Sequence, residues 1–136
     1  MKVDYEFQPQ SHGYEGEVIL ALVDNQKVGQ TGYIPGNPYG YLNNNAVMKV
    51  VGPFPIDIEV DQSMRGKSIG SGLLNKLLER VEEKNYDTLI IPRPGPAKEW
   101  YSRTLRALYE IGKINQVYHN HNLKLGPVII ARLPKK

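Results

Sequence analysis

Apolar and polar positions near the start of the chain follow strand patterns. Residues 2–7 alternate between apolar and polar side chains and predict a strand. Residues 17–23 are almost continuously apolar and predict a buried strand. Asp24-Asn25 is a turn pair, so residues 27–34 are predicted to return as the second strand of a hairpin. The first half of the chain is therefore expected to be rich in strands.

Turn-forming residues separate these strands from the next ones. Residues 8–16 form a connection with three helix breakers, and residues 35–45 are dense in Gly, Pro and Asn and predict a loop. Residues 46–51 are apolar with one lysine and indicate a strand. Residues 52–55 contain two prolines and interrupt it. Residues 56–60 then predict another strand.

An amphipathic helix over residues 69–84 is the clearest element of the sequence. Its apolar side chains recur at steps of three and four and should face the core: Ile69, Leu73, Leu74, Leu77, Leu78 and Val81. Residues 85–87 end it. A short buried strand is expected at residues 88–91, and the proline-rich residues 92–96 break it. A second helix is predicted over residues 97–111. Two closing strands follow, at residues 113–119 and 127–133.

Composition limits the class of protein. The 136 residues suit one domain, residues 1–136, and 40% of them are hydrophobic. No apolar run reaches the ~20 residues of a membrane span, so we expect no membrane partner. Cysteine is absent, which excludes disulfides and cysteine catalysis and suits a cytoplasmic protein. The net charge of +3 would help to recruit an anionic cofactor but is too small to indicate a nucleic-acid partner.

Residues 60–72 carry the strongest chemical signal. They form a glycine-containing turn between the strand at residues 56–60 and the long helix. Unpaired N–H groups at the start of a helix, together with the helix dipole, favour an anion there. Arg65 and Lys67 add positive charge at the same place. We therefore predict a ligand that carries phosphate.

Two common phosphate motifs do not fit this turn. Gly66-Lys67-Ser68 matches the end of a P-loop, but Asp61 stands where the P-loop needs its first glycine. The dinucleotide pattern G-x-G-x-x-G is also absent. The pattern that remains is Arg65-x-x-Ser68-x-Gly70. It resembles the pyrophosphate motif R/Q-x-x-G-x-G/A of the GNAT superfamily of N-acetyltransferases, with Ser68 in place of the first glycine.

The order of the predicted elements also resembles that family from about residue 18 onward. The resemblance implies an α/β fold of the acyl-CoA N-acyltransferase type. It has a mixed central sheet of six or seven strands, splayed central strands and two main helices. The region between the first two strands is shorter than in the family, so the N-terminal helical region is reduced. Residues 56–60 and 88–91 would be the two splayed strands.

The resemblance implies an enzyme that uses acetyl-CoA (coenzyme A being its product) and transfers the acetyl group to a primary amine. The amine would attack the thioester directly, in a ternary complex. The main chain of Ile58 and Val60 would hold the pantetheine arm. The pyrophosphate would bind to Arg65, Gly66, Lys67, Ser68, Ile69, Gly70 and Ser71.

A tyrosine is the family's usual proton donor to the leaving thiolate, in a pattern like A-x-x-F-Y. Residues 97–101, Ala-Lys-Glu-Trp-Tyr, are similar to it, so Tyr101 is the predicted general acid. Tyr109 is the rival. It lies about 80° round the helix from Tyr101, so both cannot point at one sulfur. Trp100 is expected to pack in the core.

A base would be needed if the amine arrives protonated. Glu59 is the predicted base, on the same strand face as Asp57; the alternative is that both are simply solvated. His12 could reach the acceptor from its loop. His119 and His121 have a spacing that could bind a metal, but no third ligand is in sight, so no metal is predicted.

The acceptor remains open between a small amine, a polyamine, an aminoglycoside, a lysine and a protein N-terminus. The loop at residues 35–45 and its neighbouring tyrosines could form an apolar wall or a partner surface. A homodimer is also left open. The alternative function is a non-catalytic module that binds coenzyme A or a partner with the same fold. It is favoured by Ser68 and by Pro94, which replaces a family asparagine. A third alternative is a nucleic-acid binder that uses Arg65, Lys67, Arg93 and Arg103.

Overall fold

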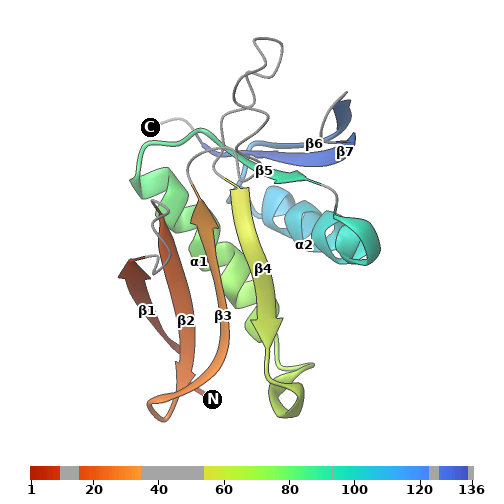
Figure 1. Cartoon of the computed structure of the whole chain (residues 1–136). Helices are drawn as coiled ribbons and strands as arrows, with labels where there is room; N and C mark the ends of the chain where they lie inside the picture. Colours follow the sequence, from red (N-terminus) through yellow and green to blue (C-terminus); the bar gives the residue numbers. More distant parts are fainter. Residues whose placement is uncertain (10–15, 35–53, 93, 123–125, 135–136) are drawn as a thin grey trace.

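A computed structural model describes residues 1–9, 16–34, 54–92, 94–122 and 126–134 of the chain (Figure 1). Its strands are β1 (Asp4–Pro9), β2 (Glu17–Val23), β3 (Gln26–Ile34), β4 (Phe54–Val60), β5 (Thr88–Pro92), β6 (Gln116–Asn122) and β7 (Gly126–Arg132). Its helices are α1 (Ile69–Glu83) and α2 (Lys98–Glu110), each preceded by a short 3-10 turn, η2 (Gln62–Met64) and η3 (Gly95–Ala97).

The first four strands form one antiparallel sheet in the order β1-β2-β3-β4. The predicted hairpin of β2 and β3 is confirmed. Its turn residues Asp24 and Asn25 both have positive φ angles, 52° and 63°. Two such residues make the tight turn whose twist matches that of the flanking strands. Local turn chemistry was therefore sufficient to predict this pairing.

The last three strands form a second antiparallel sheet in the order β5-β7-β6. These strands run across one end of the first sheet, and α2 packs beside β6 (Figure 1). β4 and β5 are in contact, but no hydrogen-bonded ladder joins them among the described residues. The predicted α/β class with splayed central strands is thus confirmed, and the splay divides the seven strands into two sheets.

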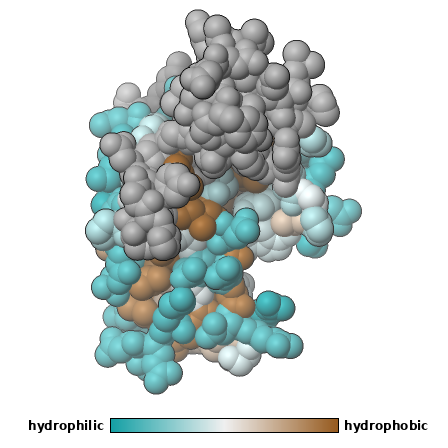
Figure 2. All heavy atoms as spheres, viewed as in Figure 1, coloured by the Kyte–Doolittle hydropathy of each residue, from teal (hydrophilic) through white to brown (hydrophobic). Residues whose placement is uncertain are grey.

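Helix α1 covers one face of the first sheet (Figure 1). All six apolar positions of its predicted stripe are buried. Gly29 on β3 allows the helix to come close, because a Cβ atom there would lie 2.8 Å from the Glu59 carbonyl and 3.2 Å from Leu73 Cδ1. The core extends from α1 to α2 and the second sheet, where Leu105 of α2 and Ile129 of β7 are also buried. The opposite face of the first sheet shows hydrophobic side chains between hydrophilic ones (Figure 2).

Some element boundaries differ from the predicted ones. β1 begins and ends two residues later than expected, and β4 begins at Phe54 rather than Ile56. β4 is the last strand of its sheet, so Pro55 can lie within it although it has no N–H to donate. The predictions for His12, Arg93 and residues 35–45 and 46–51 fall outside the described residues. No described helix is long and apolar enough to span a membrane.

Candidate active site

A β-bulge interrupts the pairing of β3 and β4. Gln30 pairs with Glu59 and Gly32 pairs with Ile56, so two residues of β4 lie opposite the single Thr31. The extra residue bends the bulged strand and leaves part of its main chain without a ladder partner. The Thr31 hydroxyl donates a 2.9 Å hydrogen bond to the Ile56 carbonyl. The bulge therefore lies within the strand segment that was expected to hold a cofactor.

The turn after β4 ends in an unusual helix start. Ser68 precedes α1 in the left-handed conformation, with φ 62° and ψ 20°, and its side chain does not cap the helix. The N–H of Gly72 donates to the Ser68 carbonyl at 3.0 Å. The N–H groups of Ile69, Gly70 and Ser71 precede this first helical bond and have no partner within the helix. Three main-chain donors are therefore available to an anion at this end of α1.

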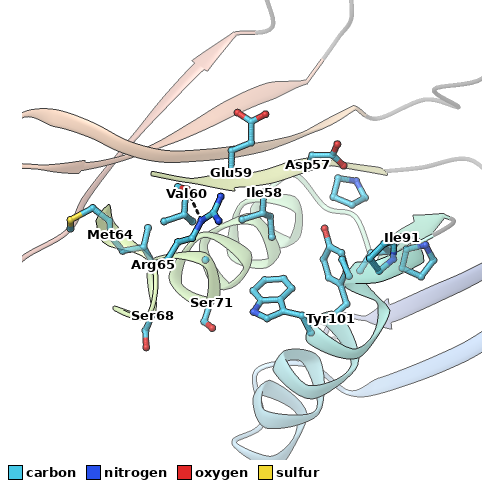
Figure 3. A pocket seen from close by; sticks show the side chains of 18 residues that line it. Asp57, Ile58, Glu59, Val60, Met64, Arg65, Ser68, Ser71, Ile91 and Tyr101 are labelled. Carbon is cyan, nitrogen blue, oxygen red and sulfur yellow. Dashed lines mark hydrogen bonds between the residues drawn. The ribbon is translucent and has the colours of Figure 1, made fainter. Parts of the chain in front are cut away.

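A cleft of about 1320 Å³ opens beside this helix start (Figure 3). One wall is β4, and the opposite wall is the segment that joins β5 to α2. The lining residues include every predicted site residue except Lys67: Ile58, Glu59, Val60, Arg65, Gly66, Ser68, Ile69, Gly70, Ser71 and Tyr101. Lys67 is exposed and does not line the cleft. The structure thus brings together residues from β4, α1, α2 and the turn that precedes α1.

Arg65 lies at the same end of the cleft as the free amides of α1 (Figure 3). Its Nε donates to the Val60 carbonyl at 3.4 Å, which holds the guanidinium over the end of β4. Positive charge and main-chain donors therefore coincide, and both favour a phosphate group.

Gly70 lines the cleft between Trp100 and Val60. A Cβ atom at this position would be 3.4 Å from Trp100 Cζ2 and 3.8 Å from Val60 Cγ2. One methyl group would fit in ordinary contact, but a larger side chain would fill the cleft. Trp100 is half-buried; it packs against the core, as predicted, and it also lines the cleft.

Tyr101 lies deeper in the cleft. The residue is only 7% exposed, and its hydroxyl points toward β4 (Figure 3). Its ring packs edge-on against Trp100, with the centroids 5.1 Å apart. Burial raises the pKa of Tyr101 to about 12, and the nearby charge of Asp57 adds to the rise. The phenol therefore keeps its proton at neutral pH and can donate it.

The rival tyrosine lies elsewhere. Tyr109 is 48% exposed and lines a second, separate hollow between α2 and β6. In that hollow Ser102 Oγ and His119 Nε2 are 2.9 Å apart. The helix thus directs its two tyrosines to different sites, and Tyr101 is the one that lines the main cleft.

Glu59 and Asp57 project from the same side of β4, away from Ile58 and Val60 (Figure 3). Both side chains are exposed and both line the cleft. Gln30 Nε2 donates a 3.1 Å hydrogen bond to Glu59 Oε2. Among the described residues, no group of three or more potential metal ligands occurs.

Several residues of the cleft were not among the predicted site residues. Met64, Ile91, Pro94, Pro96 and Ala97 also line it. The only local signal for them is the Pro-Gly-Pro run at residues 94–96, which turns the chain from β5 into α2 through η3. Their place in the cleft depends on the packing of α2 across from β4.

A protein-family model described as the acetyltransferase (GNAT) family matches residues 2–105. No curated protein sequence matches the chain significantly.

Several solved structures share the fold. An acetyltransferase of the GNAT family from Staphylococcus aureus is 20% identical with a TM-score of 0.55, over 88% of this chain and 68% of the other. An IAA acetyltransferase from Bacillus cereus is 16% identical with a TM-score of 0.56, over 97% and 99%. A Salmonella typhimurium protein solved with its cofactor acetyl-CoA is 11% identical with a TM-score of 0.51, over 89% and 66%.

Proposed function

Because the chain belongs to the acetyltransferase (GNAT) family, we propose that it transfers an acetyl group from acetyl-CoA to a primary amine by direct attack in a ternary complex. The observation that carries this proposal is the single cleft in which free helix amides, the bulged strand and a buried tyrosine meet. The first two features suit a cofactor with a pyrophosphate and an extended arm. The third suits a proton donor.

The residues fit acetyl-CoA in a definite direction along the cleft. The amides of Ile69, Gly70 and Ser71 would hold the pyrophosphate, with the guanidinium of Arg65 beside them. The main chain of Ile58 and Val60 at the bulged strand would hold the pantetheine arm. When bound, the cofactor supplies an acetyl group on a thioester. Its sulfur would then lie toward the Tyr101 end of the cleft.

Tyr101 would act as the general acid. Its raised pKa keeps the phenol protonated, and its hydroxyl faces the part of β4 where the thioester would lie. A proton from this hydroxyl would neutralise the leaving sulfur. A carboxylate on the other side of β4, either Glu59 or its neighbour Asp57, would accept a proton from the incoming amine, directly or through water.

A two-stage experiment tests the proposal. Thermal unfolding is first measured with acetyl-CoA or coenzyme A at concentrations up to the millimolar range, and both should raise the melting temperature by mass action. Release of free thiol is then followed across a panel of primary amines. Stabilisation without thiol release would favour the alternative, a non-catalytic module that binds coenzyme A. The absence of any stabilisation would contradict both functions.

A further inference from the structure

The main cleft has opposite charges on the two sides of β4. Arg65 and the free amides of α1 lie on the side of Ile58 and Val60, near the end of the strand (Figure 3). Asp57 and Glu59 project from the other side of β4, away from Ile58 (Figure 3). The positive side suits the pyrophosphate of the proposed cofactor. The negative side is then the part of the site that the second substrate would meet.

No cation of the described residues neutralises these two carboxylates. Neither Asp57 nor Glu59 forms an ion pair with a described Lys, Arg or His. The one polar contact is the amide of Gln30 on Glu59 Oε2, which orients the carboxylate and leaves its charge in place. Alternate residues on one strand face are about 6–7 Å apart, so two separate cationic groups could bind side by side.

Tyr101 provides a second and independent observation. It is 93% buried, since its exposure is 7%, and no described residue hydrogen-bonds to its hydroxyl. The hydroxyl points at β4 beside Asp57 (Figure 3), and the charge of Asp57 contributes to the raised pKa of the phenol. A buried hydroxyl that has no partner among the described residues is costly unless a further group, such as a ligand, satisfies it. It therefore marks the reacting end of the site.

We propose that the acceptor is an aliphatic amine with a second positive charge. Its reacting amino group would bind next to Asp57 and the Tyr101 hydroxyl, and its second ammonium would bind to Glu59. This inference rests on the proposed acetyl transfer and specifies its acceptor class. Two carboxylates on one side of a strand suit two nitrogen atoms joined by a short alkyl chain.

These groups account for every bond and proton of the acetyl transfer. The nitrogen–carbon bond forms as the carbon–sulfur bond of the thioester breaks. A protonated primary amine loses two protons on becoming an amide. One restores the proton that Tyr101 gives to the sulfur, and the other passes through Asp57 to solvent.

Three acceptors with the same four-carbon chain test the charge requirement: diaminobutane, butylamine and aminobutanoate. With the full chain and saturating acetyl-CoA, thiol release should give a kcat/KM about two- to fivefold higher for diaminobutane than for butylamine. Aminobutanoate should be the poorest acceptor, because its carboxylate meets Glu59. Raising the salt concentration from about 50 mM to about 500 mM should reduce the preference, because the carboxylates are exposed.

Matched variants identify the responsible side chains. Glu59→Gln should abolish the preference for diaminobutane mainly through KM, with the Kd for acetyl-CoA unchanged. Asp57→Asn should lower kcat/KM for all three acceptors. Glu6→Gln, an exposed carboxylate on the far strand of the first sheet, serves as the control and should change none of these values. Equal use of butylamine and diaminobutane by the unaltered protein would overturn the inference.

Calorimetric binding of diaminobutane separates this inference from the proposed function. If acetyl-CoA binds and no amine is acetylated, the diamine should still bind to the protein loaded with coenzyme A and lose affinity in Asp57→Asn. If acetyl-CoA does not bind, the proposed function fails, and the same titration is done on the free protein. In either case, the cationic acceptor would be refuted if the diamine did not bind, or if it bound equally well to Asp57→Asn.

Discussion

The hydroxyl of Thr31 on β3 donates a 2.9 Å hydrogen bond to the main-chain carbonyl of Ile56 on β4. Thr31 is completely buried, and it is the one buried side chain in the described residues that is neither apolar nor aromatic. The bond lies at the bulge, where the regular ladder between the two strands is interrupted. It joins β3 to β4 where their ladder is irregular, and so it stabilises the bulge in the strand that lines the cleft.

Replacement of Thr31 should therefore disturb both stability and the site. Thr31→Val keeps the shape but removes the hydroxyl, so the free energy of unfolding should fall by about 1–3 kcal/mol. Thr31→Ser keeps the hydroxyl and loses one methyl group, which should cost about 0.8 kcal/mol. Urea unfolding measures both values. The Kd for acetyl-CoA should rise in Thr31→Val and stay near the original value in Thr31→Ser; equal affinities in the two variants would show that the hydroxyl does not support the site.

Substitutions of Gly70 test whether the cofactor binds in the cleft. Gly70→Leu should abolish acetyl-CoA binding, because the side chain would extend beyond the 3.4 Å gap to Trp100. Gly70→Ala is the matched control and should bind, since a single methyl group fits. Calorimetric titration gives the affinities, and circular dichroism checks that both variants remain folded. Tight binding by a folded Gly70→Leu protein would place the cofactor elsewhere.

Ser68 occupies a backbone conformation that favours glycine, at φ 62°. Such a residue costs on the order of 1–3 kcal/mol, which explains in physical terms why the resembled motif has glycine at this position. Ser68→Gly should bind acetyl-CoA as tightly as the unaltered protein, and Ser68→Val should bind poorly because a β-branched residue is strained there. A loss of affinity in both Ser68→Gly and Ser68→Ala would instead show that the hydroxyl itself contacts the phosphate.

The two tyrosines of α2 should respond differently. Tyr101→Phe is expected to lower kcat about 100-fold, the usual contribution of a general acid, with a smaller change in the Kd for acetyl-CoA. Tyr109→Phe should leave kcat unchanged, because Tyr109 points about 80° away from Tyr101 round the helix and lines a separate hollow. Steady-state thiol release with a saturating amine measures both. A large loss of kcat in Tyr109→Phe but not in Tyr101→Phe would identify Tyr109 as the general acid instead.

Glu17 connects β2 to both α1 and β3. Its carboxylate accepts hydrogen bonds from Arg80 Nε at 2.7 Å and from the Tyr33 hydroxyl at 2.8 Å. The bonds from Arg80 lower the pKa of Glu17. The stabilisation is therefore present above the pKa of about 4.3 that Glu has in an unfolded chain, and it is lost as the pH falls through the lower folded value.

Glu17→Gln should lower the free energy of unfolding at pH 7 by about 2 kcal/mol. The difference from the unaltered protein should shrink as the pH is lowered below about 4. Urea unfolding over a series of pH values measures this. Glu6→Gln, on the neighbouring strand, should show no such difference. A constant gap between Glu17→Gln and the unaltered protein at all pH values would exclude the charge of Glu17 as its cause.

The sequence alone determined the elements whose signals are local. The stripe of α1 follows from a helical period, the β2–β3 hairpin from its Asp-Asn turn, and the free amides from a glycine-containing turn ahead of a helix. These features depend on neighbours a few residues apart, so a single sequence carries them. The motif from Arg65 to Gly70 likewise pointed to residues that line the cleft in the structure, Lys67 excepted.

The tertiary structure decided how separate elements meet. Which of Tyr101 and Tyr109 lines the cleft depends on the side of α2 that packs toward β4. Helical spacing could show only that the two side chains point in different directions. The bulge beside Thr31 arises from the pairing of strands more than twenty residues apart, and the exclusion of Lys67 from the cleft depends on the path of one turn. Such features are set by packing and hydrogen bonding between distant segments, because only the folded chain brings those segments into contact.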